Sequence, residues 1–251
     1  MKEDLRVHIV PIGYDSYTRV TDSLIKKNAE KVYFIRHKEN NRGHEKFYEK
    51  VKKELASKAK RIAIREVKLD IWNYYDCVAA FREIITKEKK NGNHIYINVS
   101  TGTKITAMAG MLAAMAWKIE PYYVRLTHPS LKKIETIPKA VVEDPEELQA
   151  YDMEKPKPVY MDILDHLSKH KGVMRKKPLV EYLKDKKIIK PVDDSEEFSE
   201  NAKLSQLRVL LDPMKDKWNF VTIEHSGRRS EVMITENGRK ALRIFGIEDL
   251  G

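Results

Sequence analysis

His94-Ile-Tyr-Ile-Asn98-Val-Ser-Thr-Gly-Thr-Lys104 is followed by an uncharged, apolar run from Ile105 to Trp117. Residues 94–98 are typical of a short buried strand, since they are mainly apolar and rich in β-forming side chains. The run that begins at Ile105 is apolar nearly all round, which predicts a helix buried on several sides. We therefore expect a strand, a tight loop and a core helix in direct succession, the unit from which α/β sheets are built.

The same alternation of strand and helix extends to both sides of this unit. Apolar runs predict strands at residues 5–12, 31–35, 61–67, 94–98 and 121–126, with a sixth at 133–137. Helical spacing of apolar residues predicts helices at residues 20–29, 47–55, 71–88 and 105–117. This pattern indicates an α/β fold with a Rossmann-like, mostly parallel sheet and helices on both faces. Residues 61–67 are the least apolar of the strands and are expected at an edge.

A second domain is predicted to follow the sheet. The acidic, proline-bearing residues 142–158 predict a linker between a ligand-binding domain at 1–141 and an α+β domain at 159–251. The latter is expected to have the order of a winged helix–turn–helix domain, namely three helices, a hairpin and a closing helix. These elements are expected at residues 159–167, 178–184, 200–211, 220–225 with 230–234, and 236–246, with Ser199 and Thr235 as helix caps. In the third helix, four leucines are expected to face inward: Leu204, Leu207, Leu210 and Leu211.

Composition and charge narrow the classes of protein that fit. The 251 residues carry a formal net charge of +10, of which +7 falls within residues 1–155 and +3 within residues 156–251. A basic first domain suits a polyanionic ligand, whereas DNA binding by the second must depend on where its charges lie. The sequence shows neither the pattern of a signal peptide nor an apolar run of about 20 residues, so a cytoplasmic protein is expected.

Few side chains suit a metal site or covalent catalysis. Cys77 is the single cysteine, which excludes an internal disulfide and a CxxC zinc site, and it is expected to be a small buried apolar residue. His166 and His170 share a helix face with Asp162 but lack a further convincing ligand. We therefore expect no metal and no other cofactor. The tryptophans are expected to be core or interface residues, not stacking platforms: Trp72, Trp117 and Trp218.

The loop after the fourth predicted strand has the composition of a phosphate-binding site. The helix that follows leaves free N–H groups and a partial positive charge at its N-terminus, and Gly102 lets the backbone approach a ligand closely. Three hydroxyl groups and an ammonium group complete the loop: Ser100, Thr101, Thr103 and Lys104. The alternative is that Ser100 or Thr101 only caps a core helix and that Lys104 is solvated. The spacing matches neither a Walker A loop nor a GxGxxG fingerprint.

The loop after the first predicted strand, Gly13-Tyr-Asp-Ser-Tyr-Thr-Arg19, is expected to face the phosphate loop. The reason is that ligands of open α/β sheets bind beyond the carboxyl ends of the strands, where the strand order reverses. The hydroxyls, Asp15 and the tyrosines of this loop could contact a nucleotide, or Ser16 or Thr18 could simply cap a helix. Arg36, after the second strand, could contact a base or be ordinary surface-loop polarity.

These two loops, Gly13-Tyr-Asp-Ser16 and Asn98-Val-Ser-Thr-Gly-Thr-Lys104, carry a resemblance to a known family. Residues 5–137 resemble a CRISPR-associated Rossmann-fold (CARF) domain, and the whole chain is similar to archaeal CARF–winged-helix transcriptional regulators. The resemblance implies a homodimer with one shared site for a cyclic oligoadenylate, most often the tetra-adenylate, in CRISPR antiviral signalling. The candidate ligand-binding residues are Gly13, Tyr14, Asp15, Ser16, Asn98, Ser100, Thr101, Gly102, Thr103 and Lys104.

Two functions from different classes remain open. The first is a non-enzymatic, ligand-gated regulator that binds double-stranded DNA, although winged helices also serve as dimerisation or protein-binding modules. Its expected DNA contacts are Lys203, Ser205, Gln206, Arg208, Arg228 and Arg229. The second is a metal-independent ring nuclease that cleaves cyclic tetra-adenylate to a 2′,3′-cyclic phosphate. There, Ser16 would orient the attacking 2′-hydroxyl and Lys104 would stabilise the developing charge.

Overall fold

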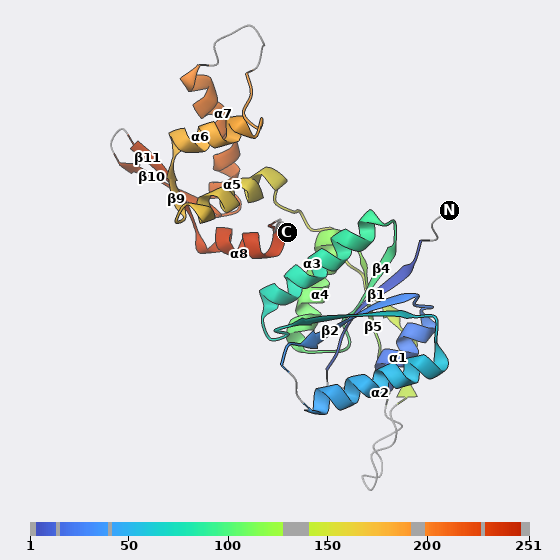
Figure 1. Cartoon of the computed structure of the whole chain (residues 1–251). Helices are drawn as coiled ribbons and strands as arrows, with labels where there is room; N and C mark the ends of the chain where they lie inside the picture. Colours follow the sequence, from blue (N-terminus) through green and yellow to red (C-terminus); the bar gives the residue numbers. More distant parts are fainter. Residues whose placement is uncertain are drawn as a thin grey trace. The chain divides into compact units, whose positions relative to one another are not determined.

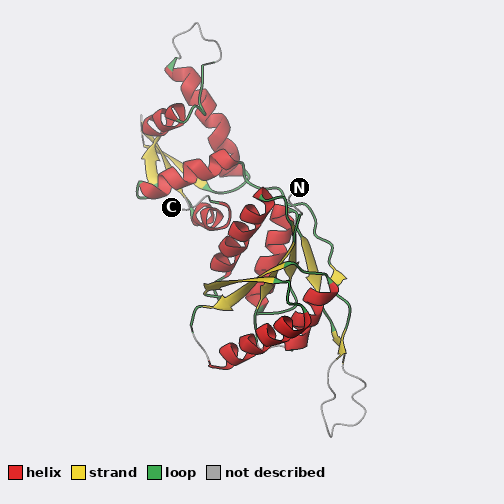
Figure 2. Cartoon of the chain, turned by 45° about the vertical axis from the view of Figure 1, so that its right-hand side comes forward, coloured by secondary structure: helices red, strands yellow, loops and turns green. Residues whose placement is uncertain are grey.

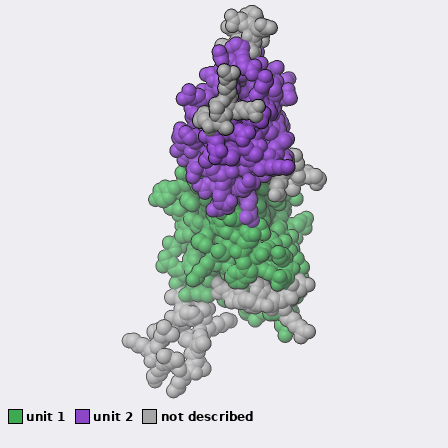
Figure 3. Space-filling view, turned by 90° about the vertical axis from the view of Figure 1, so that its left-hand side faces the viewer, with its two compact units in different colours: residues 1–154 green, residues 155–251 purple. Residues whose placement is uncertain are grey.

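A six-stranded sheet in the order β3-β2-β1-β4-β5-β8 lies in the N-terminal part of the chain. Residues 1–154 form this N-terminal unit, which Figure 3 colours green. In the computed structural model, residues 4–13, 16–39, 42–127, 141–191, 199–226 and 229–246 are described. Five strands run parallel, and β8 is antiparallel to β5 at one edge. The strands are β1 (Arg6–Pro11), β2 (Lys31–His37), β3 (Ala63–Leu69), β4 (His94–Asn98), β5 (Glu120–Tyr123) and β8 (Glu146–Glu147).

Helices cover both faces of this sheet (Figures 1 and 2). One face carries α1 (Tyr17–Lys26) and α2 (Arg42–Lys58), and the other carries α3 (Tyr74–Lys90) and α4 (Lys104–Trp117). Under α1 and α2, the apolar core includes Val51 and Leu55, which are fully buried. The predicted doubly wound, mostly parallel fold is therefore confirmed, and so is the position of β3 at an edge.

The region after β5 differs from the expectation. Instead of one strand at residues 121–126, β5 ends at Tyr123, and β6 (Leu126–Thr127) pairs with β7 (Val141–Val142). Val124 lies between β5 and β6, and its carbonyl accepts a hydrogen bond from Arg19 Nε at 2.7 Å instead of from a neighbouring strand. Strand β8 belongs to the sheet although it lies in the stretch expected as a linker. The expected strand at residues 133–137 falls outside the described residues.

The C-terminal unit, residues 155–251, has its own core and a three-stranded sheet in the order β10-β11-β9. Its elements are α5 (Pro158–Lys169), β9 (Val173–Arg175), α6 (Lys176–Asp185), α7 (Glu200–Asp216), β10 (Val221–Ser226), β11 (Arg229–Ile234) and α8 (Glu236–Phe245). The caps expected at Ser199 and Thr235 are confirmed, since their hydroxyls accept hydrogen bonds from the amides of Ala202 and Gly238. Strand β9 was not predicted. The inward orientation expected for Leu204 is wrong, because its side chain is exposed.

His8 is a titratable group buried within β1. Its ring stacks on Tyr96 with centroids 4.8 Å apart, and its Nδ1 lies 3.2 Å from the hydroxyl of Tyr122. Burial, together with the charges of Lys27 and Arg6, lowers the pKa of His8 to about 3. The imidazole is therefore neutral in the folded protein over the whole range in which an unfolded histidine titrates.

We expect His8→Gln to weaken the acid sensitivity of folding. Below the ordinary histidine pKa of about 6.5, the unfolded chain takes up a proton that folded His8 refuses, so stability falls as the pH falls towards 3. At pH 4.5 this effect lowers the free energy of unfolding by about 2–3 kcal/mol relative to pH 7. The His8→Gln variant should not lose this part of its stability. Urea unfolding at the two pH values measures it, with exposed His94→Gln as the control. An unchanged difference in His8→Gln would show that His8 does not carry the effect.

Candidate functional site

The carboxyl ends of β1 and β4 form the point at which the strand order reverses. From β1 the chain proceeds to β2 and β3 on one side, and from β4 it proceeds to β5 on the other. The loops that leave these strands meet there. A Cβ atom added to Gly13 would lie 2.8 Å from the carbonyl oxygen of Gly102 and 2.9 Å from its Cα. The structure thus brings together, backbone against backbone, the two loops that the sequence analysis singled out.

The phosphate loop, residues 98–104, is held by its own hydrogen bonds. Asn98 is fully buried, and its Oδ1 accepts from the amide of Ser100 at 2.9 Å and also from the Ser100 hydroxyl. The hydroxyl of Thr101 donates to the carbonyl of Pro11 at 2.7 Å. Gly102 has a φ of +86°, and a Cβ there would lie 2.5 Å from Pro11 Cβ. The glycine is therefore required by the backbone conformation and by close packing against the chain itself.

Thr103 is the N-cap of α4. Its hydroxyl accepts from the amide of Thr106 at 3.1 Å, and the hydroxyl of Thr106 accepts from the amide of Thr103 at 2.8 Å. The cap is thus Thr103 and not Ser100 or Thr101, which the alternative interpretation favoured. Because Ser100 and Thr101 already donate their hydroxyl protons within the chain, these two groups are not free to donate to a phosphate in this arrangement.

Lys104, the first residue of α4, places a positive charge at the end of the phosphate loop. Its side chain is exposed, and within the described residues no carboxylate lies within ion-pair distance of it. It stands at the N-terminus of α4, which carries a partial positive charge. A helix leaves its first amides without backbone acceptors, and here the capping box already satisfies those of Thr103 and Thr106. The arrangement can attract an anion to the solvent side of the phosphate loop.

The first loop contributes Ser16, which occupies the N-cap position of α1. Its hydroxyl lies 2.6 Å from that of Thr18, and it makes no side-chain hydrogen bond to the helix backbone. Tyr14 and Asp15 lie outside the described residues.

Arg36 does not belong to the site. It is buried, with its guanidinium 2.6 Å from the carboxylates of both Glu45 and Glu66, and it lies over the ring of Tyr48 at 3.9 Å. These contacts tie β2 to β3 and α2. The interpretation of Arg36 as a base contact or a loop residue is therefore wrong, because its position in β2 turns it into the core.

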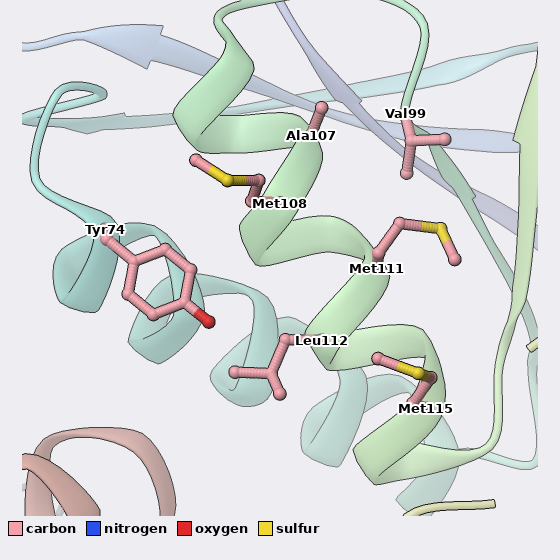
Figure 4. A pocket seen from close by; sticks show the side chains of 7 residues that line it. All are labelled: Tyr74, Val99, Ala107, Met108, Met111, Leu112 and Met115. Carbon is pink, nitrogen blue, oxygen red and sulfur yellow. The ribbon is translucent and has the colours of Figure 1, made fainter. Parts of the chain in front are cut away.

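The outer face of α4 is not covered by the other described elements of the N-terminal unit, so burial on several sides is wrong for this face. We call Met108, Met111 and Met115 the methionine stripe, since their spacing puts them on one side of the helix. Met108 is 54% exposed, and Tyr74 from α3 lines the same shallow apolar pocket as the stripe (Figure 4). Lys104 precedes Met108 by four residues and continues the stripe at the end of α4 where the phosphate loop lies.

Trp72 is a second feature that the sequence analysis missed. Of the two positions expected for Trp72, the core is wrong, because its side chain is 65% exposed in the chain described, and the interface stays a prediction. Trp72 stands in the turn between β3 and α3, and the carbonyl of the preceding residue, Ile71, is 3.3 Å from the hydroxyl of Thr103. Helical periodicity carries no information about a residue in such a turn, and only its neighbours in space show its exposure.

The candidate DNA-binding residues lie on α7 and on the hairpin. Ser205 and Arg208 are exposed, with Arg208 Nε 3.3 Å from Asp212, whereas Lys203 is half-buried. Gln206 is engaged within its own unit, because its side-chain amide bonds both the N–H and the carbonyl of Lys190. Arg229 begins β11, and Arg228 lies outside the described residues. A group of exposed lysines near the end of α6, which the sequence analysis missed, is visible in the sequence as a charge run: Lys184, Lys186, Lys187 and Lys190.

Other chemistry finds little support in the part of the chain that is described. There, no three histidine, cysteine, aspartate or glutamate side chains are placed to hold a metal ion. Burial raises the pKa of the Cys77 thiol to about 12, so this cysteine is a packing residue and not a nucleophile. None of the described helices combines the length and the apolar character needed to cross a membrane.

Two family models match the chain, one on each unit. Residues 160–246 match a model described as the DUF6293 C-terminal winged helix domain. The C-terminal unit is a winged-helix domain. Residues 6–128 match a model described as HFX_2341_N-like, N-terminal. The expected architecture, a Rossmann-like domain followed by a winged-helix domain, is confirmed.

The individual relatives either match only part of this chain or share little sequence identity with it. The uncharacterized protein MJ1513 of Methanocaldococcus jannaschii is 36% identical over 128 residues, which are 47% of this chain and 37% of that protein. Csm6 of Enterococcus italicus, bound to cyclic hexa-2′-fluoro-hexa-dAMP, has a TM-score of 0.42 and 11% identity over 85% of this chain and 56% of its own. Can2 of Sulfobacillus thermosulfidooxidans, in complex with cyclic tetra-adenylate, has a TM-score of 0.40 and 13% identity over 96% and 64%, respectively. The chain spans less than two thirds of each relative.

Proposed function

We propose that the protein is a DNA-binding regulator that responds to a cyclic oligoadenylate, which binds at the carboxyl edge of β1 and β4. The observation that carries this proposal is the contact between Gly13 and Gly102, which closes two loops together at the reversal of strand order. Lys104, at the first turn of α4, is exposed at the end of the loop that makes this contact. A phosphate group complements this lysine in charge, and the resemblance to CARF domains supplies the class of nucleotide.

The methionine stripe supports a two-fold dimer as the state that binds. Positions 104, 108, 111 and 115 fall on one side of α4 because their spacings of four, three and four residues follow the helical repeat. When a second copy covers the stripe about a two-fold axis that runs along α4, the two Lys104 side chains lie at the same end of the interface. A cyclic oligonucleotide with its own two-fold symmetry can then meet the same residues twice.

The winged-helix domain supplies the proposed output. In this fold the third helix, here α7, lies in the major groove and the hairpin contacts the flanking backbone. Ser205 and Arg208 are available on the exposed side of α7. The ion pair between Arg208 and Asp212 is solvent-exposed, and such pairs contribute about 1 kcal/mol or less, so a DNA phosphate can replace the carboxylate.

Calorimetry against cyclic tri-, tetra- and hexa-adenylate, with linear tetra-adenylate as the control, tests the proposed ligand. We expect a cyclic form to bind at one ring per dimer and the linear form to bind more weakly. A mobility-shift titration with duplex DNA, at several salt concentrations and with or without the bound ring, tests the output. Failure of every ring to bind would overturn the sensor, and absence of DNA binding at low salt in both states would overturn the regulator.

The alternative function, a ring nuclease, would use the same binding groups as the regulator. One further measurement distinguishes the two functions. The protein is incubated with cyclic tetra-adenylate and EDTA, and the mixture is analysed for linear products. The regulator as proposed leaves the ring intact over many hours. Turnover to a linear product with a 2′,3′-cyclic phosphate would establish the enzyme in place of the passive sensor.

A further inference from the structure

Trp72 presents an exposed indole on a fixed turn. Its amide donates to Asp70 Oδ1 at 3.0 Å, and the amide of Asn73 donates to the carbonyl of Asp70 at 3.0 Å. Asn73 then caps α3 by accepting from the amide of Tyr75 at 3.1 Å. Ile71, next to Trp72, is only 1% exposed. The backbone is thus held on both sides of Trp72 while the indole remains in solvent, so a ligand that stacks on it orders little of the chain.

The turn of Trp72 touches the phosphate loop. The hydroxyl of Thr103 lies 3.3 Å from the carbonyl of Ile71. Trp72 follows one partner of this contact and Lys104 follows the other, so an exposed aromatic ring and an exposed ammonium group stand at the same edge of the sheet. Single-stranded nucleic acids are commonly bound by this combination, in which bases stack on aromatic rings and cations neutralise the backbone.

We infer that Trp72 is a ligand-contacting residue on which an adenine ring stacks while an adjoining phosphate lies at Lys104. The inference rests on the proposed function and names the base contact of that site. Single exposed apolar side chains are common on protein surfaces and need no explanation in themselves. The distinguishing observation is the rigid attachment of this one to the phosphate loop. Since every base has a stacking face, Trp72 contributes affinity and not discrimination between bases.

The test compares Trp72→Ala and Trp72→Phe with a matched variant, Tyr151→Ala. Tyr151 is 74% exposed. Its neighbour Asp152 pairs with Lys118, which lies just before β5 and so at the amino ends of the strands, opposite the candidate site. Calorimetry with the ring that the unchanged protein binds should show a loss of about ten- to a hundredfold in affinity for Trp72→Ala. Trp72→Phe should retain most of the affinity, and Tyr151→Ala should bind as the unchanged protein does.

Fluorescence provides a readout that a merely structural role would not move. The chain has three tryptophans, so Trp117→Phe combined with Trp218→Phe leaves Trp72 as the single indole emitter. Its emission should be quenched when the ring binds, because the base stacks on the indole. The inference would be overturned if Trp72→Ala bound the ring with normal affinity, whether or not the dissociation constant of its dimer had changed. The proposed function would then still stand. Failure of the unchanged protein to bind any ring would overturn both.

Discussion

Lys104→Met should weaken binding of the cyclic oligoadenylate by about a hundredfold or more. A charged hydrogen bond contributes about 1.5–3 kcal/mol, and a two-fold site contains the lysine twice. Methionine keeps most of the aliphatic stem and a good helix former at the start of α4, so the change removes the charge and little else. Calorimetry with the ring at constant salt measures the effect.

The control for this prediction is Lys87→Met, which changes the net charge equally. Lys87 is exposed in the last turn of α3, where the chain returns to the amino end of β4. It therefore lies at the end of the strands opposite the candidate site. If long-range charge were responsible, the two variants would lose affinity alike. A Lys104→Met protein that binds within threefold of the unchanged protein would show that the anion site lies elsewhere.

Met108→Glu should dissociate the dimer and, with it, abolish tight binding of the ring. Met108 is 54% exposed within the chain, so the glutamate is accommodated in a single copy without harm to folding. In the dimer, a carboxylate from each copy would be buried in an apolar interface, which costs several kcal/mol. We expect the dimer dissociation constant to rise at least about a hundredfold, as measured by analytical ultracentrifugation.

Ala56→Glu serves as the control for Met108→Glu, since it adds the same charge at an exposed residue of α2, on the face of the sheet that does not carry α4. It should leave both the dimer and the affinity unchanged. An unaltered dimer in Met108→Glu would show that another surface joins the copies. A monomeric unchanged protein that binds the ring would refute the shared two-fold site, while leaving the anion site at Lys104 in place.

The elements that the sequence predicted well are those whose signals are local. The strand at residues 94–98, the caps at Ser199 and Thr235 and the hairpin of the second unit depend on neighbouring residues along the chain. The doubly wound arrangement also follows from local order, because alternating strands and helices have few ways to form one sheet. β9 escaped notice because it has only three residues, too few to show a period.

The sequence pointed to the candidate site, but it did not show which contacts the residues of that site make. Ser100, Thr101 and Thr103 have the side chains that a phosphate needs, and the same side chains also satisfy backbone groups. The structure shows the hydroxyls of Ser100 and Thr101 bonded to Asn98 and Pro11, and that of Thr103 bonded to the amide of Thr106. Which partner a hydroxyl takes depends on the distance to groups elsewhere in the fold, and spacing in the sequence does not contain that distance.

By itself, then, the sequence determined the succession of elements, the two units and the edge of the sheet at which a ligand is to be sought. The tertiary structure decided which side chains at that edge remain available, since Lys104 and Trp72 face solvent while Arg36 is turned inward between carboxylates. It also decided that α4, apolar nearly all round, keeps one face uncovered. The physical reason is that the hydrophobic pattern shows which side chains of a helix are stabilised by burial. Whether they are buried depends on neighbouring elements, and only the folded chain brings these together.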